Sequence, residues 1–403
     1  MWRVVVYSGL LIGAMVASRA QASDWYVEPR LSVAASSRLH GSETLTSQVN
    51  AAGLKLEHYG DVLSFNFDGE LQYDAVFDWT DQYSREARDE YGTRIWLDEA
   101  YLSWLWADWS FYLGYQKVVW GEADDLRVTD VVNPLDLKDF VLFDIDDYRI
   151  SQPMLRTEST HGEWDVELLW LFDFEPNQLA ASGSEFAMLA LDGIPRDEPS
   201  GGEFGFRLTT ILFDADTSFY GFSGYQDDPV FVADQQQVIG KYYDQHMLGN
   251  SLSFSAGDFI LRTELAWFYQ QSYATTSFDR EKHNTTQGLL GIDYLYRDWL
   301  ITGQVSDRYI NGWSKALSVP ESDTVYTLSA EGNLMESKLT ARAAVTYADA
   351  NGGGELYQVK LAYIPTSAWK LQLNVDLLNG NENNFFGQYK DNDRVWVSTT
   401  YYL

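Results

Sequence analysis

Apolar and polar residues alternate with a period of two along much of the chain. Over residues 63–73, 259–267, 339–347 and 369–377, one face of each segment is apolar or aromatic and the other is polar and charged. Successive side chains of a β-strand point to opposite faces, so the pattern predicts strands with one apolar surface. A water-soluble β-sandwich alternates in the same way, so the links between strands must separate the two classes.

Short and long links alternate strictly along the chain. The short links lie at 59–61, 107–108, 161–163, 214–216, 256–258, 297–298, 333–336 and 365–367, and the long ones at 42–48, 81–92, 121–150, 175–202, 227–244, 271–284, 311–323, 351–353 and 379–390. Outer-membrane barrels have short turns at one end and long loops at the other. We therefore predict a single transmembrane antiparallel β-barrel of about 18 strands, or about 16 if residues 31–39 and 49–57 are not strands.

The two ends of the chain predict where the barrel resides. Residues 1–22 read as a secretory signal peptide, in which Arg3 precedes an apolar run and Ala20 to Ala22 form a small-x-small cleavage sequence. Residues 23–403 would then form the barrel. The segment from Val395 to Leu403 alternates and ends on an apolar residue, which resembles the terminal strand that the barrel-insertion machinery reads. These features predict an integral protein of the bacterial outer membrane.

Composition narrows the class of protein further. The net charge is −31, and removing Arg3 and Arg19 with the signal peptide gives −33. Nucleic-acid binding requires the opposite sign of charge. The chain has no cysteine, which excludes a disulfide-stapled fold, and its 15% of aromatic residues suits the aromatic girdles of a membrane barrel.

The link at 121–150 departs from the alternation because it is long, acidic and irregular. Such a loop is uncommon in a compact domain and is usually functional. We predict that it folds into the lumen and forms a constriction. It is the third external loop by this count, which resembles the position at which classical porins fold a loop inward. Its candidate residues are Trp120, Gly121, Glu122, Asp124, Asp125, Arg127, Asp130, Asn133, Pro134, Asp136, Asp144, Asp146, Asp147 and Arg149.

Two details of this loop bear on its placement. Residues 140–143 form an apolar run that needs a surface to pack against, which favours the lumen over a solvated external loop. Asn133 and Pro134 suit the N-cap and first position of a short helix. Trp120 and Tyr148 are placed to anchor the two ends of the loop.

Charged residues also fall on the lumen side of the predicted wall: Asp68, Glu70, Glu99, Arg207, Arg262, Glu264, Arg342, Lys360 and Asp376. We expect loop carboxylates such as Asp124, Asp130 and Asp136 to face wall cations such as Arg262 or Arg342. The mixed charges either select solutes or form a paired interior network, and the sequence leaves both interpretations open. The acid-rich loop predicts a preference for cations, because carboxylates at a narrow place stabilise passing positive charge.

The same stretch resembles a known family. Its pattern comprises Gln116, Trp120-Gly121, Asp125-Leu126-Arg127-Val128, Asp130-Val131-Val132-Asn133-Pro134, Asp136 and Arg149-Ile150. It is similar to a Gram-negative family of porin-like outer-membrane proteins of unknown function. That family commonly has glycine where Asp125 stands. Its members are often discussed alongside lipid-exporting pumps, so the resemblance implies an export or envelope-lipid role and an export-pump partner.

These observations predict an outer-membrane conduit for small or amphipathic solutes, with the outlet of an export system as a sharper form. The alternative is a structural or surface-binding barrel closed by its loop, with no transport. The chain lacks a GxSxG motif and the spacing of a metal site, so we expect no enzyme, cofactor or metal. Outer-membrane lipid and lipopolysaccharide are the expected partners, the latter through divalent ions on acidic loops.

Overall fold

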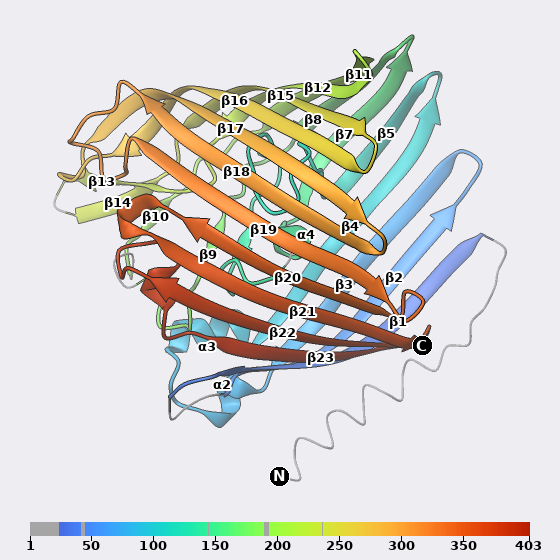
Figure 1. Cartoon of the computed structure of the whole chain (residues 1–403), viewed down its shortest axis with the longest axis horizontal. Helices are drawn as coiled ribbons and strands as arrows, with labels where there is room; N and C mark the ends of the chain where they lie inside the picture. The colour runs from blue at the N-terminus through green and yellow to red at the C-terminus, as the bar shows by residue number, and fades with distance from the viewer. Residues whose placement is uncertain (1–23, 42–44, 144, 189–192, 236) are drawn as a thin grey trace.

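Eighteen strands form one closed antiparallel sheet in the computed structural model, which describes residues 24–41, 45–143, 145–188, 193–235 and 237–403 (Figure 1). They are β1 (Trp25–Arg38), β2 (Leu45–Tyr59), β3 (Leu63–Asp74), β4 (Thr93–Trp106), β5 (Trp109–Gln116), β7 (Gln152–His161), β8 (Trp164–Leu171), β11 (Glu203–Leu212), β12 (Ala215–Tyr225), β15 (Asp244–Ala256), β16 (Phe259–Ala274), β17 (Arg280–Tyr296), β18 (Trp299–Asn311), β19 (Ser322–Leu334), β20 (Leu339–Ala348), β21 (Gly354–Thr366), β22 (Trp369–Gly380) and β23 (Arg394–Tyr402). The predicted signal peptide lies outside the described residues.

The first and last strands close the barrel. β1 pairs with β2 on one side and with β23 on the other, where Arg30 lies opposite Tyr402 and Arg38 opposite Arg394. The predicted count of 18 strands is therefore confirmed. The alternative of 16 is wrong, because both doubtful segments lie within long, fully paired strands.

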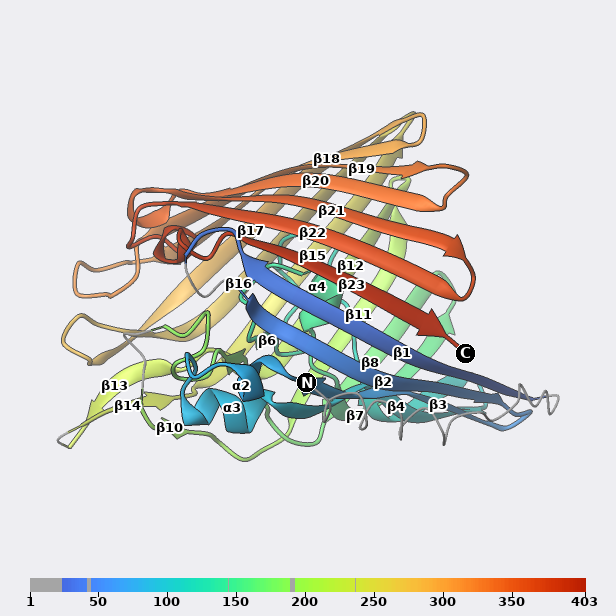
Figure 2. The same ribbon diagram turned by 90° about the horizontal axis from the view of Figure 1, so that it is seen from below.

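Turns gather at one end of the barrel and long loops at the other (Figures 1 and 2). The β11–β12 turn is typical of the short links: Phe213 (φ 53°) and Asp214 (φ 62°) both adopt the left-handed conformation of a two-residue hairpin. The small elements all lie in the long links: α2 (Val76–Trp79), α3 (Arg85–Tyr91), β6 (Asp136–Leu137), α4 (Ile145–Tyr148), β9 (Gln178–Leu179), β10 (Arg196–Asp197), β13 (Val230–Asp234), β14 (Gln237–Lys241), η2 (Ala350–Gly352) and η3 (Gly387–Tyr389).

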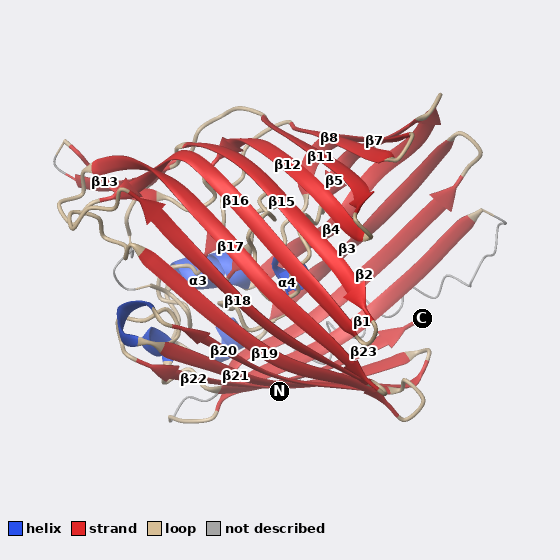
Figure 3. Cartoon of the chain, turned by 45° about the horizontal axis from the view of Figure 1, so that its top comes forward, coloured by secondary structure: helices blue, strands red, loops and turns tan. Residues whose placement is uncertain are grey.

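The wall is built inside out relative to a soluble protein. On β16, outward Leu265 and Trp267 are 55% and 38% exposed, whereas inward Glu264 is 4% exposed. A surface of this kind is stable only against lipid, which is the arrangement of a membrane-spanning barrel. Figure 3 shows that the wall is entirely strand and that α4 lies inside the barrel.

Candidate functional site

Asn133 closes the neck of the long loop between β5 and β7. Its Oδ1 accepts a hydrogen bond from the Val118 amide (2.7 Å), and its Nδ2 donates to the carbonyls of Gln116 (3.1 Å) and Ile150 (2.8 Å). The fully buried side chain thus ties both ends of the loop to its middle. The predicted helix starting at Asn133 and Pro134 is wrong, because the neck uses the side chain that would have capped it.

Buried Asp130 holds the neck from inside the loop. Its Oδ2 lies 2.8 Å from Arg149 Nη2 and 3.0 Å from Arg127 Nε. The expectation that Asp130 faces a wall cation is wrong, since the loop supplies both guanidinium groups itself. Removal of either partner would leave a buried charge without its compensation, so the cluster fixes the path of the loop.

Trp120 fastens the loop to one side of the wall. Its indole Nε1 donates to Glu167 of β8 (2.8 Å), and its ring packs against Tyr220 and Phe222 of β12 at centroid distances of 5.3 and 6.4 Å. Loop and wall share one apolar cluster here: Val118, Trp120, Val128, Val132, Met154, Leu169, Leu171, Tyr220, Phe222, Met247, Ala266, Phe268 and Leu289. The lumen beside β7–β8, β12 and β15–β17 is therefore filled by apolar packing.

The turn after Trp120 wraps around the carboxylate of Glu264 on β16. That carboxylate accepts hydrogen bonds from the amides of Glu122 (2.6 Å), Ala123 (2.8 Å) and Thr129 (3.0 Å), and from Thr129 Oγ1 (2.8 Å). Gly121 has φ +89°, and a Cβ there would lie 2.7 Å from the carboxylate, so this turn requires glycine. The wall side chain occupies the turn as an anion occupies a backbone nest.

Four more loop carboxylates pair with arginines that are widely spaced around the barrel. The nitrogen-to-oxygen distances are 2.8 Å for Asp124–Arg262, 2.6 Å for Asp125–Arg342, 2.7 Å for Asp136–Arg94 and 2.9 Å for Asp139–Arg394. Since these arginines belong to β16, β20, β4 and β23, the loop spans the lumen. The expected contact of Asp124 with Arg262 is confirmed, and Asp136 meets a wall cation that the sequence reasoning did not name.

Arg394 is a second buried centre that sequence reasoning missed. It is 1% exposed and contacts Asp376 (3.4 Å) as well as Asp139, while Gln358 donates to Asp376 (2.8 Å). Arg394 directly precedes the alternating terminal segment. The one feature of the sequence that could have identified Arg394 was its position on the inward face of that strand.

The apolar run at 140–143 packs against the wall, as predicted. Phe140 and Leu142 are buried, and Gln358 Nε2 donates to the Leu142 carbonyl (2.9 Å). The surrounding cluster contains Phe186, Ala348, Leu356, Leu378, Phe386 and Tyr389. This contact holds the far end of the loop near β20–β22.

The link between β8 and β11 joins the long loop, and sequence reasoning missed this contact. β9 pairs with β6 in parallel, placing Asp136 opposite Gln178. Asn177 Oδ1 accepts from the Leu135 amide (2.7 Å). The pairing comprises only two residues on each strand, too few to give a pattern in the sequence.

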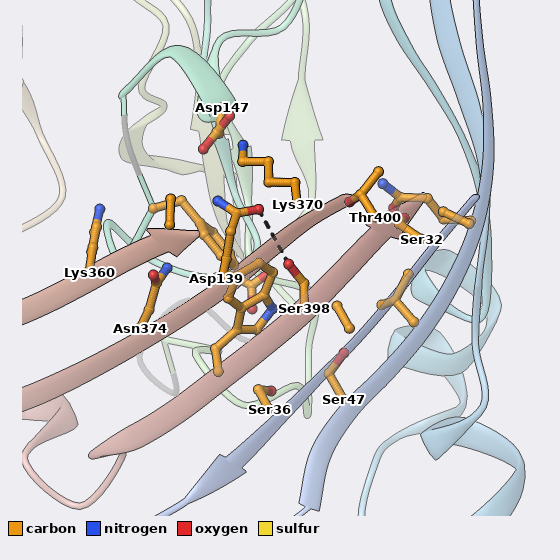
Figure 4. A pocket seen from close by; sticks show the side chains of 18 of the residues that line it. Ser32, Ser36, Ser47, Asp139, Asp147, Lys360, Lys370, Asn374, Ser398 and Thr400 are labelled. Atoms are coloured by element: carbon orange, nitrogen blue, oxygen red, sulfur yellow. Dashed lines mark hydrogen bonds between the residues drawn. The ribbon is translucent and has the colours of Figure 1, made fainter. Parts of the chain in front are cut away.

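A cavity of about 580 Å³ remains between the far end of the loop and the wall of β1–β4 and β19–β23 (Figure 4). Its charged lining residues have both signs: Arg30, Glu70, Arg94, Asp136, Lys138, Asp139, Asp147, Glu331, Arg342, Lys360 and Lys370. Trp96, Phe143 and Trp396 add aromatic surface. The loop thus divides the barrel into an apolar filled side and a polar hollow side.

Burial raises the pKa of the loop carboxyl groups, whereas ion pairing with arginine or lysine lowers it. Burial raises the pKa of Glu122 and of Asp124, and Arg262 only partly offsets this effect. Burial also opposes ionisation of Asp139, but Arg394 and Lys138 outweigh it and lower the pKa of this carboxyl. Asp139 is therefore held as a carboxylate at neutral pH.

The other predicted residues lie on the wall or along the cavity. Asp68 and Glu70 flank Arg30 (2.7 and 3.6 Å), Glu99 accepts from Asn66 (3.1 Å), and Arg207 contacts Glu167 (3.2 Å). Lys360 and Asp147 line the cavity. Asp144 and the side chain of Asp146 lie outside the described part of the chain. Within that part, no group of three or more His, Asp or Glu side chains is arranged to hold a metal ion.

The closed wall, apolar outside and charged inside, together with a loop fastened across the lumen, defines the fold of outer-membrane porins. The chain belongs to the family described as "Protein of unknown function (DUF1302)", whose model matches residues 38–403. No curated protein matches it. No helix among the described residues is long and apolar enough to span a membrane.

Solved porin structures share this fold at low sequence identity. Pseudomonas aeruginosa OccK8 (OprE) has a TM-score of 0.57 and 11% identity, over 94% of this chain and 98% of that one. P. aeruginosa OpdK with vanillate gives 0.56 and 10%, and OccK2 (OpdF) in complex with glucuronate gives 0.56 and 11%, each over 94% and 98% of the two chains. The similarity shows the fold.

Proposed function

We propose that the protein is an outer-membrane conduit for small or amphipathic solutes, in which residues 121–150 form the constriction. The observation that carries the proposal is the asymmetric lumen. The loop is fastened to β8, β12 and β16 by buried contacts, while the opposite wall keeps a charged cavity of about 580 Å³. A barrel of this strand number is too wide for wall side chains alone to fill, so the loop sets the passage.

The cavity suits organic acids among such solutes. Lys360 and Lys370 rise from neighbouring strands into it (Figure 4), and Trp396 offers a ring for an apolar body. The porins solved with vanillate and glucuronate share the fold and carry organic acids in their structures. An outlet for an envelope-lipid export system is the sharper form of the proposal, supported by the family resemblance.

Planar-bilayer conductance of the purified protein tests the proposal. We expect stable open channels, and a larger conductance after deletion of residues 124–147, because that deletion removes most of the loop that narrows the lumen. The matched control shortens the link at 312–321, which leaves the long loop intact. Silence of both the parent and the 124–147 deletion would favour a structural barrel without transport. Outer-membrane fractionation with heat-shifted gel mobility tests the location independently.

A further inference from the structure

The charged cavity runs along almost the whole height of the wall (Figure 4). At the short-turn end it is lined by Lys370 and Tyr402, the second residue of β22 and the last residue of β23. At the long-loop end it is lined by Ser36 and Ser47, each two residues inside its strand, β1 or β2. A solute that crosses the barrel through this cavity must therefore pass the external ends of β1 and β2.

A second segment, the strap, crosses the long-loop end. It consists of residues 177–187 in the link between β8 and β11. The strap begins at Asn177, whose backbone N–H donates to a carbonyl of the link after β12 (3.0 Å). Its middle, at Ala181, packs in the apolar cluster of α2 and α3, and its end, at Phe186, packs in the cluster that covers β20–β22. The strap thus extends from one side of the external mouth to the other.

Glu185 is the only charged residue in the sequence of the strap, whose other positions are mostly small or apolar. Its side chain is 10% exposed, and its Oε1 lies 3.0 Å from Nε of Arg38 on β1. Arg38 follows Ser32, Ala34 and Ser36 on the inward face of β1, and those three residues line the cavity. The strap therefore places a carboxylate on the cation that continues the wall of the cavity at its external end.

Arg38 uses only part of its hydrogen-bonding capacity in this contact. A guanidinium group carries five N–H donors. The Nε–H of Arg38 donates to Glu185, whereas neither Nη group has an acceptor among the described residues. The side chain is 31% exposed, so these donors are within reach of solvent. A free carboxylate, which binds guanidinium best through two parallel hydrogen bonds, can therefore compete with Glu185 for Arg38.

We propose that Glu185 is a tethered carboxylate that closes the external end of the passage, and that Arg38 is the entry site where the carboxylate of an organic acid displaces it. The exchange puts one carboxylate in place of another, so the net charge at the guanidinium group is unchanged. Arg30 and Lys370 line the opposite end of the cavity and supply positive charge there. A neutral solute of the same shape does not compete with Glu185. The choice of an organic acid rests on the proposed function, whereas the contact between Glu185 and Arg38 does not.

A single thiol on the strap reports whether the strap lifts, because the chain has no cysteine of its own. Ala181→Cys places that thiol at a position that is 6% exposed. Its labelling rate by a water-soluble thiol reagent is measured on the purified barrel in detergent micelles, and heat-shifted gel mobility checks that each variant is assembled. We expect Glu185→Gln to raise the labelling rate several-fold. The matched control is Glu382→Gln, which removes an external carboxylate that pairs with Lys390, and it should leave the rate unchanged.

Benzoate and benzamide test the entry site, because they share a ring and only benzoate carries a carboxylate. Benzoate should raise the labelling rate of Ala181→Cys several-fold, whereas benzamide, or chloride at the same concentration, should not. Arg38→Gln should abolish the response to benzoate.

Two results would overturn the proposal. A parental labelling rate in Glu185→Gln would show that Glu185 does not hold the strap. Equal responses to benzoate and benzamide, or a benzoate response that survives in Arg38→Gln, would show that Arg38 is not the entry site. Labelling in micelles requires no transport, so a benzoate response together with silent bilayers would reject the conduit and retain the site.

Discussion

Glu264 offers the sharpest test of how the loop is held. Glu264→Ala removes the acceptor of four hydrogen bonds from residues 122–129 while leaving the loop sequence unchanged. A buried donor left without a partner costs about 1–3 kcal/mol. The amides of Glu122 and Ala123 are partly exposed and can recruit water, so we count only the two donors of fully buried Thr129. The expected destabilisation of the closed loop is then about 2–6 kcal/mol.

This free energy corresponds to an increase of roughly 30-fold to 10⁴-fold in the population of the open loop. The chain has no cysteine, so a single Val128→Cys substitution places one thiol on the loop itself, within the apolar cluster that loop and wall share. Its labelling rate by a water-soluble thiol reagent reports opening. Glu264→Gln keeps one acceptor oxygen but turns an NH₂ group toward the remaining donors, so it should also accelerate labelling, though less.

Glu70→Ala is the matched control, because Glu70 is a wall carboxylate that lines the cavity on β3 and lies beside Arg30, not beside the loop. It should leave the labelling rate of Val128→Cys unchanged. If Glu264→Ala gives the parent rate in an assembled barrel, the carboxylate does not hold the loop, and the reasoning from its four hydrogen bonds is wrong.

Three further changes test the lumen. Lys370→Glu should shift the reversal potential in a salt gradient toward cations because it inverts a charge lining the cavity, whereas Lys390→Glu on an outer loop should not. Arg394→Ala leaves two carboxylates without their buried partner and should cost about 3–5 kcal/mol in urea unfolding, with Arg297→Ala in a turn as the control. The pKa of Asp139 is lowered below its usual 3.8 in the folded state, so the stability that it contributes is present above pH 3.8 and is lost as the pH falls further. The free energy of unfolding in urea should therefore fall in acid, and it should fall less steeply for Asp139→Asn.

The strand architecture could be predicted because it depends on local patterns. Alternation and link length are both properties of short segments, and together they gave 18 strands, the long third loop and its apolar run. Which charges meet depends on the three-dimensional path of the loop. Asp130 illustrates the limit, since it meets Arg149, 19 residues away in the sequence, where Asn133 holds the two ends of the loop together. The contact between β6 and β9 leaves no periodic signal at all.

The pairing also changes the argument about selectivity. Cation preference was inferred from carboxylates facing an open passage, whereas Asp124, Asp125, Asp136 and Asp139 lie against arginines. The negative charge of each of these carboxylates is largely compensated by its arginine partner. The field in the cavity then depends on side chains lining its wall, Lys360 and Lys370 among them. The cation preference stays a prediction, and the Lys370→Glu experiment measures the contribution that opposes it.

The quality of the alternation itself carries information about the lumen. The alternating segments 63–73, 339–347 and 369–377 belong to β3, β20 and β22, which border the cavity and therefore need polar inward faces, whereas 259–267 on β16 alternates because inward Arg262 and Glu264 bind polar groups of the loop. β8 instead reads Trp-Asp-Val-Glu-Leu-Leu-Trp-Leu and is apolar on both faces beyond Glu167, because lipid covers one face and the loop covers the other. A strand buried on both faces reads as a continuous apolar run. In a membrane barrel such a run marks the part of the wall against which an internal segment packs. The sequence of the wall strands, and not only that of the loop, therefore indicates where the loop lies.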